Sequence, residues 1–128
     1  MNTLTKAEEQ VMQILWVRQE SIVRDLVDRF PDPKPAYNTV STVLRVLEKK
    51  GFVDHKAYGT TYVYFPLVTK KDYSKFQFTN LIKNYFNGSF PKMAAFFAKE
   101  NNLSIQELEE MIDMAKDELK DDHEGNEP

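Results

Sequence analysis

Three short helical patterns followed at once by two β-rich stretches occupy residues 6–66, and this order constrains the fold more than any other feature of the chain. Thr5-Lys6-Ala7-Glu8 is typical of a capping box, and the spacing of the apolar residues after it predicts a helix from about residue 6 to about residue 17. A second helix over residues 22–30 must stop at the proline-rich turn 31–35, because proline lacks an amide donor and restricts the residue before it. A third helix follows this turn and ends at Gly51.

The two β-rich stretches, residues 52–56 and 60–65, predict a small hairpin joined by Ala57-Tyr58-Gly59. Three helices and then a hairpin are the layout of a winged helix-turn-helix domain. In such domains the third helix enters the major groove of DNA and the hairpin, or wing, reaches over the backbone. The predicted fold class is therefore mostly α with a small β-hairpin wing.

Helical spacing returns after Val68 and predicts three more helices with wide apolar faces, which need a partner surface. We expect self-association, since a twofold dimer buries the same apolar patch on both copies. The alternative is that these helices pack against the first domain. We expect a winged-helix DNA-binding domain at 1–68, a helical dimerisation domain of three helices at 69–120 and a disordered tail at 121–128. The predicted dimerisation residues are Phe78, Leu81, Ile82, Phe86, Leu108, Ile112 and Leu119.

The first residues lack the apolar core of a signal peptide, and no apolar run approaches the roughly 18 residues of a membrane span. We therefore expect a soluble, cytoplasmic protein with no membrane insertion.

Charge is unevenly distributed along the chain. The formal net charge is −3, which taken alone disfavours a nucleic-acid binder. Residues 33–71, however, hold seven basic and two acidic residues, a balance of +5, while residues 100–128 hold two basic and eleven acidic residues, a balance of −9. A polyanion would meet the basic middle of the chain alone, although two ordinary solvated faces would have the same charges.

The polar face of the third predicted helix carries residue types that suit base edges and phosphates. Arg forks onto guanine, Asn onto adenine, and hydroxyl groups reach phosphates, whereas Ser and Thr are poor choices for a helix face that merely meets solvent. Lys56 on the wing is the natural phosphate contact. The predicted DNA-binding residues are Tyr37, Asn38, Thr39, Ser41, Thr42, Arg45, Lys49, Lys56, Tyr58 and Thr60.

Catalytic and metal sites find little support in the residues. The chain has no Cys, no G-x-S-x-G elbow and no phosphate-cradling glycine loop, so we expect neither an enzyme nor a cofactor. His55 lacks a Cys or second His nearby and is more often structural than a ligand, so no metal is expected. Besides a DNA-binding protein, the residues leave open a winged-helix protein-protein interaction adaptor. A small hydrolase is the third hypothesis, and no catalytic constellation supports it.

Two segments give the chain a resemblance to a known family. One is Leu4-Thr5-Lys6-Ala7-Glu8 with Ile14-Leu15-Trp16, and the other, at 37–53, contains Tyr-x-Thr-Val-x-Thr-x-Leu and then Leu-Glu-Lys-Lys-Gly. Together with residues 54–56 and 62–68, these resemble the penicillinase and methicillin-resistance repressors of the BlaI/MecI/CopY type.

This resemblance implies a homodimeric repressor that binds a palindromic double-stranded DNA operator and controls genes of β-lactam antibiotic resistance. It also implies a membrane metallopeptidase sensor as a partner, and derepression by a cut in the dimerisation region. The cut in well-known members lies between Asn and Phe, and the corresponding residues here are Phe96, which departs from the pattern, and Phe97, which matches it. The copper-responsive relatives carry Cys pairs that this chain lacks.

Overall fold

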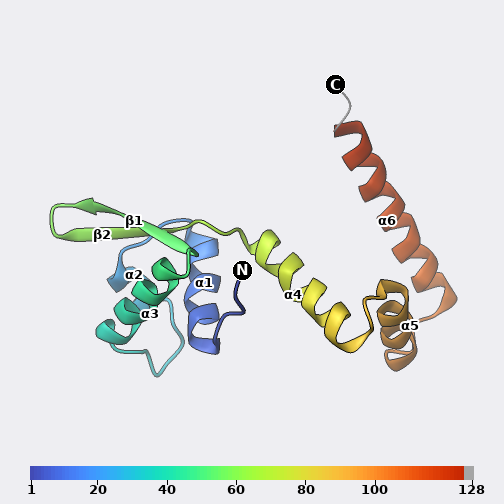
Figure 1. Cartoon of the computed structure of the whole chain (residues 1–128), viewed down its shortest axis with the longest axis horizontal. Coiled ribbons are helices and arrows are strands. Elements are labelled where there is room, and N and C mark those ends of the chain that lie inside the picture. Colours follow the sequence, from blue (N-terminus) through green and yellow to red (C-terminus); the bar gives the residue numbers. More distant parts are fainter. Residues whose placement is uncertain (126–128) are drawn as a thin grey trace. The chain divides into compact units, whose positions relative to one another are not determined.

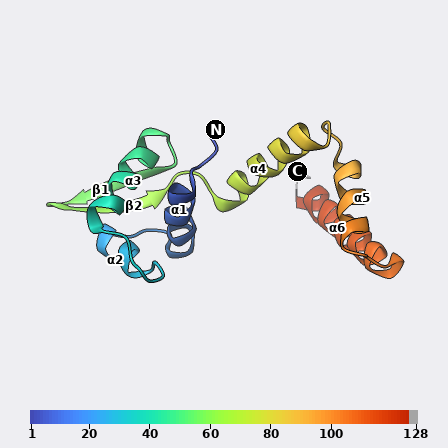
Figure 2. The same ribbon diagram turned by 90° about the horizontal axis from the view of Figure 1, so that it is seen from below.

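The computed structural model describes residues 1–125, which form six helices and one antiparallel hairpin. Figures 1 and 2 show their arrangement from two directions. The order of these elements confirms the predicted fold class, mostly α with a β-hairpin wing. The elements are α1 (Lys6–Arg18), α2 (Val23–Asp28), α3 (Tyr37–Lys49), β1 (Val53–Tyr58), β2 (Thr61–Pro66), α4 (Lys70–Tyr85), α5 (Phe90–Glu100) and α6 (Ile105–Gly125).

The predicted capping box at the start of α1 is present. The Glu8 amide donates to Thr5 Oγ1 at 3.2 Å, and the Thr5 amide donates to Glu8 Oε1 at 2.8 Å. Two of the amides that a helix start leaves without partners are thereby satisfied. The helix therefore begins where the sequence predicts.

Helices α1, α2 and α3 enclose the core of the first compact unit, which runs from Met1 to Thr79. Each of these three helices contributes at least one fully buried leucine, and the buried Phe52 completes the core between α3 and the hairpin. In α3 the buried positions are Val40, Leu44 and Leu47, at the i, i+4, i+7 spacing of one helix face. This face fixes the rotation of α3, so its opposite face must point to solvent.

The hairpin extends further towards its tip than predicted. Strand β1 continues through Ala57 and Tyr58, and Tyr58 pairs with Thr61, so the turn consists of Gly59 and Thr60. Gly59 has a φ of +64°, which glycine adopts without steric cost. A two-residue turn needs this conformation at its first position, and the three-residue loop expected at 57–59 was therefore wrong.

A short bridge ties the hairpin to the loop between α1 and α2. The Ser21 amide donates to the Tyr64 carbonyl at 2.9 Å, and the Tyr64 amide donates to the Ser21 carbonyl at 2.8 Å. Both residues are buried. This pairing holds β2 against the helices, and the rest of the hairpin projects beyond them (Figures 1 and 2).

Helix α4 begins inside the first unit. Tyr73 is buried beside Trp16, and its hydroxyl accepts a hydrogen bond from the Leu4 amide at 3.0 Å. The Trp16 indole donates to the Val68 carbonyl at 2.8 Å. The packed unit thus extends beyond Val68, the predicted end of the DNA-binding domain, and the division of the chain into a DNA-binding and a dimerisation domain stays a prediction.

The second compact unit begins at Asn80 and contains α5 and α6. Helix α6 is continuous to Gly125, so residues 121–125 are helical where a tail was expected, because extending an existing helix costs little per residue. Residues 126–128 of that predicted tail lie outside the described residues. None of the helices described is both long enough and apolar enough to cross a membrane.

One ion pair joins the first turn of α1 to the end of α3. Lys50 Nζ lies 2.9 Å from Glu8 Oε1 and 2.8 Å from Oε2, and only 4% of the Glu8 surface is exposed. Burial raises the pKa of Glu8, but hydrogen bonds from Lys50 and Thr5 outweigh it and leave the pKa below its ordinary value of 4.5. The carboxylate form therefore stabilises the fold above pH 4.5, and this stabilisation is lost as the pH falls through the lower pKa of the folded state.

We expect Lys50→Met to lower the free energy of unfolding by about 1–3 kcal/mol near neutral pH, because it leaves a buried carboxylate without its cation. The deficit should narrow on acidification, as Glu8 becomes protonated. Urea unfolding at about pH 7 and about pH 4 measures both effects. The exposed neighbour Lys49→Met is the control and should change stability by less than about 0.5 kcal/mol; equal effects of the two variants would contradict the role of the pair.

Candidate nucleic-acid interface

The outward face of α3 presents the side chains that the sequence singles out. Because Val40, Leu44 and Leu47 are buried, the polar positions between them point away from the core. Ser41 is half-buried, and the hydroxyl of Thr42 donates to the Asn38 carbonyl one turn earlier at 2.8 Å, which orients that hydroxyl along the helix. The exposed members of the predicted set on α3 are Tyr37, Asn38, Thr39, Thr42, Arg45 and Lys49.

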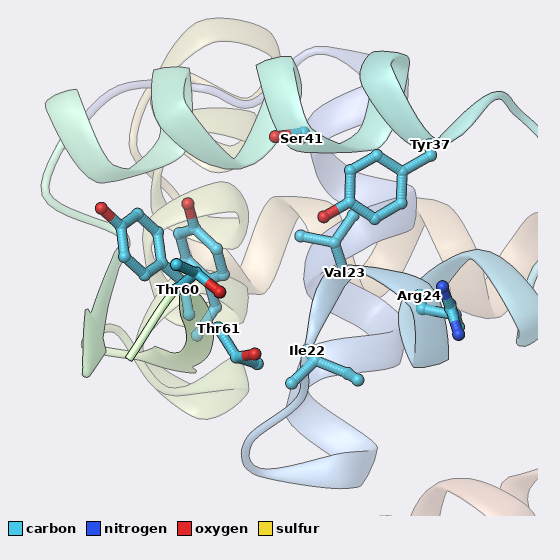
Figure 3. Close-up of a pocket in the computed structure, with 9 residues that line it drawn as sticks. Ile22, Val23, Arg24, Tyr37, Ser41, Thr60 and Thr61 are labelled. Atoms are coloured by element: carbon cyan, nitrogen blue, oxygen red, sulfur yellow. The ribbon is translucent and has the colours of Figure 1, made fainter. Parts of the chain in front are cut away.

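A hollow of about 340 Å³ lies between the start of α3, the start of α2 and the wing (Figure 3). It brings together three predicted residues from two elements, namely Tyr37, Ser41 and Thr60. Their hydroxyl groups make it a polar concavity beside the exposed face of α3. Such a surface suits the sugar-phosphate backbone of a nucleic acid, which offers oxygen acceptors to hydroxyl donors.

Two wing residues, Lys56 and Tyr58, lie apart from this hollow. Successive residues of a strand point to opposite faces, and His55, Tyr62 and Tyr64 form one group of contacting rings. Lys56 is on the other face, where its ammonium lies 5.8 Å from the centre of the Phe65 ring. Lys56 and Tyr58 are exposed and free to meet a ligand, but the structure does not group them with the residues of α3.

Three exposed polar residues that line the hollow were not among the predicted residues, namely Arg24, Thr61 and Tyr62. Arg24 is exposed at the start of α2 and adds a cation at one side of the hollow (Figure 3). The strand period carried a signal for Tyr62, since it lies two positions from the buried Tyr64 and so on the same face. For Arg24 the sequence held no signal, because only the folded chain brings α2 beside the wing.

The charges around α3 are partly neutralised by neighbours. Lys50 pairs with the buried Glu8, and Glu48 contacts the imidazole of His55. Burial raises the pKa of Tyr64, the charge of Glu48 raises it further, and the charge of Arg45 opposes this effect. Tyr64 therefore stays an uncharged phenol at neutral pH, and Arg45 and Lys49 are the exposed cations that α3 offers.

The second unit holds most of the predicted dimerisation residues and both predicted cleavage residues. In α6, every described side chain from 105 to 121 except that of Leu108 is exposed, and Ile112 and Leu119 are 54% and 68% exposed. Phe78, at the end of the first unit, is also exposed, whereas Leu81, Ile82 and Phe86 are half-buried. Phe96 and Phe97 are half exposed within α5, with ring centres 5.7 and 6.4 Å from that of Phe86.

Comparison with known proteins gives consistent matches. Residues 4–117 match the family model described as penicillinase repressor. The methicillin resistance regulatory protein MecI of Staphylococcus aureus strain N315 is 28% identical over 109 residues, which cover 84% of this chain and 89% of MecI. The penicillinase repressor of Bacillus licheniformis is 24% identical over 115 residues, 89% of this chain and 90% of that protein.

Among solved structures, the DNA-binding domain of the repressor BlaI matches with a TM-score of 0.49 and 26% identity. The match covers 56% of this chain and 88% of that one.

Proposed function

The chain belongs to the penicillinase repressor family, and from that membership we propose that it represses transcription as a homodimer bound to a palindromic DNA operator. The family match, residues 4–117, extends over both compact units and confirms the resemblance found in the sequence. The family is one of transcriptional repressors and not of enzymes. The observation that carries the proposal is the exposed polar face of α3 beside the hollow under the wing.

In the proposed complex α3 enters the major groove and the hollow receives the backbone of one strand. Arg45 lies two turns from the start of α3, is exposed and has the forked donors that match guanine O6 and N7. Tyr37 and Ser41 offer hydroxyl groups to the backbone, and Arg24 adds a positive charge there. The buried face of α3 fixes the rotation of the helix, so Tyr37, Ser41 and Arg45 project from its outward side before DNA arrives.

The exposed apolar stripe of α6 supports self-association. Ile105, Leu108, Ile112, Ala115 and Leu119 recur at alternating spacings of three and four, the pattern of a helix that packs on another helix. A single chain leaves this stripe in water, where burial of each large apolar side chain would be worth about 1.5–3 kcal/mol. A second copy of the chain offers the same stripe and covers both.

Derepression is proposed to follow a cut at the Phe96–Phe97 bond by a membrane metallopeptidase sensor, with genes of β-lactam resistance as targets. Both side chains are half exposed, but the bond lies inside α5 and next to the buried Met93. Proteolysis of such a bond requires local opening of the helix. Loss of the residues after the cut removes α6, and with it the stripe that we assign to the dimer.

We expect Arg45→Ala to lower operator affinity by about 1–3 kcal/mol, and to lose discrimination at one base position of each half-site. Lys56→Ala should weaken binding to all sequences alike and reduce the dependence of affinity on salt. Gel shifts with single-base operator variants at several salt concentrations measure both. Lys6→Ala, which removes an exposed cation of α1, is the control.

An equal loss on every sequence for Arg45→Ala would contradict its base contact. If the intact protein shows no salt-sensitive binding to the DNA upstream of its own gene, the adaptor function is favoured instead.

Ile112→Asp should yield monomers in sedimentation and lower operator affinity by about 10²–10⁴-fold, because two linked half-sites bind with an avidity that one lacks. Ile112 is exposed in the single chain, so the variant leaves the fold of each unit intact. Leu108→Asp is expected to act in the same way, with some loss of stability because Leu108 is half-buried. Glu109→Gln, on the polar side of α6, should remain dimeric; a dimeric Ile112→Asp variant would remove this stripe from the interface.

Co-expression with a membrane metallopeptidase under induction should produce a fragment that ends at Phe96. Mass spectrometry of the purified protein, without further digestion, detects this fragment. Phe96→Asn, which restores the Asn-Phe pair of the family pattern, should be cut at least as fast. Phe90→Asn places the same change at an exposed phenylalanine of α5 outside the bond and is the control. An uncut chain in induced cells that have lost repression would show that another trigger acts.

A further inference from the structure

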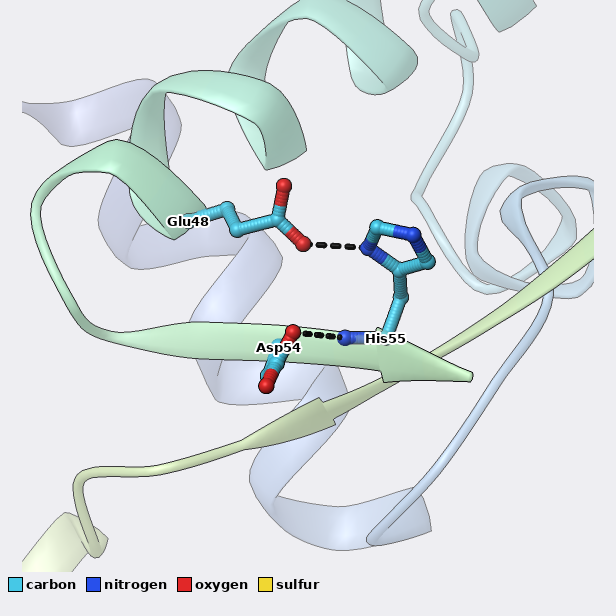
Figure 4. A group of neighbouring side chains, drawn as sticks. All are labelled: Glu48, Asp54 and His55. Atoms are coloured by element: carbon cyan, nitrogen blue, oxygen red, sulfur yellow. Dashed lines mark hydrogen bonds and ion pairs between the residues drawn. The ribbon is translucent and has the colours of Figure 1, made fainter. Parts of the chain in front are cut away.

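We propose that Glu48, Asp54 and His55 form a binding site for one divalent transition-metal cation, such as Zn²⁺, where the end of α3 meets the first strand of the wing (Figure 4). One ligand atom from each side chain, the imidazole Nδ1 and two carboxylate oxygens, lies within 4.8 Å of the others. This inference does not depend on the proposed repressor function.

The fold brings the three side chains together through a tight reversal of the chain. Glu48 occupies the next-to-last position of α3, and Gly51, with a φ of +83°, turns the backbone into β1. Asp54 and His55 are the second and third residues of that strand. Helix and strand therefore converge at the site, and neither alone supplies a full ligand set.

The imidazole is held in place before a metal arrives. The His55 ring stacks on Tyr62, with ring centres 4.3 Å apart and an interplanar angle of 25°, and it lies 5.3 Å from the ring of Tyr64. In this orientation Nδ1 faces the Glu48 carboxylate, which it contacts. The Asp54 carboxylate accepts a hydrogen bond from the His55 amide at 2.8 Å, which turns it towards the same place. Little ordering entropy is left for the metal to offset.

The donor set selects the class of metal. Two carboxylates balance the charge of a divalent cation, and one imidazole nitrogen favours zinc, nickel or iron over magnesium, calcium and manganese, which prefer oxygen ligands. The site has no thiolate or thioether, the ligands that Cu(I) prefers. Three protein ligands leave at least one coordination position to water.

Distances and access also fit. Zinc–ligand bonds of about 2.0–2.2 Å place tetrahedral ligand atoms roughly 3.3 Å apart, so small side-chain rotations convert the present cluster into a coordination shell. The metal replaces the contact between Glu48 and His55 by two bonds to itself. The side chains of Glu48 and His55 are 31% and 27% exposed, so a cation reaches them from solvent without opening the core.

The sequence alone predicts no metal here, because His55 has no Cys and no second His near it in the chain. Nothing in the sequence indicates that the carboxylates of Glu48 and Asp54 meet at this histidine. Asp54 is adjacent in a strand, where neighbouring side chains diverge, and Glu48 belongs to a different element. The sequence thus predicts no metal at His55, whereas we propose a site there, and a titration of the chain with Zn²⁺ distinguishes the two.

The test is a titration of the full chain, without a purification tag, with Zn²⁺ by calorimetry and with Co²⁺ by its visible absorption. We expect one saturable site per chain, with Co²⁺ bands typical of mixed nitrogen and oxygen ligands. His55→Gln and Asp54→Asn should each weaken Zn²⁺ binding by at least about tenfold. Asp54→Asn is the more conservative change, because Asn Oδ1 still accepts from the His55 amide, and circular dichroism verifies that each variant is folded.

His123→Gln is the matched control, since His123 is the other histidine of the chain. It should bind Zn²⁺ as the unaltered chain does. Wild-type affinity in folded His55→Gln and Asp54→Asn, loss of binding in His123→Gln alone, or no saturable binding of Zn²⁺ would each overturn the proposal.

Discussion

The burial of one face of α3 is the constraint on which the rest of the structure depends. Val40, Leu44 and Leu47 are sealed between α1 and α2, and a rotation of α3 by one residue would move them to solvent and draw polar side chains into the core. Burying a polar group without a hydrogen-bond partner costs several times more free energy than an ordinary substitution on the surface. The core therefore determines which side chains α3 offers to a partner, and Arg45 is exposed because Leu44 is not.

The wing depends on the same core through two attachments. Phe52 is buried at the base of the hairpin, and the bridge between Ser21 and Tyr64 holds β2 to the loop before α2. The contact between Glu48 of α3 and His55 of β1 adds a third link, and the tip around Gly59 lies beyond all three. The proposed DNA-binding surface of α3, the hollow and the wing thus combines a helix that is fixed by the core with a hairpin that is attached near its base.

The local elements of this fold were predictable from sequence, and the relations between distant elements were not. Capping at Thr5, the proline-rich turn and the stop at Gly51 each act over a few residues, so α1 and α3 were located closely. By contrast, the partnership of Lys50 with Glu8 spans 42 positions and withdraws a cation that the charge count had assigned to the binding surface. The hairpin turn was misplaced because Ala57 and Tyr58 suit a strand as well as a loop. Arg24 and the cluster around His55 became visible only when helix, strand and loop met in space.

Added salt is expected to affect the two proposed assembly steps, DNA binding and dimerisation, in opposite directions. In the first unit the exposed cations of α3 and the wing attract DNA, and added salt weakens that attraction because bound counterions are no longer released as favourably. In the second unit α6 combines an apolar stripe with an acidic surface, so two copies of the chain repel one another while their stripes attract. Salt screens this repulsion and would not weaken the apolar contacts of Ile112 and Leu119 in the proposed dimer. Higher salt is therefore expected to favour the proposed dimer while it weakens the attraction of α3 and the wing for DNA.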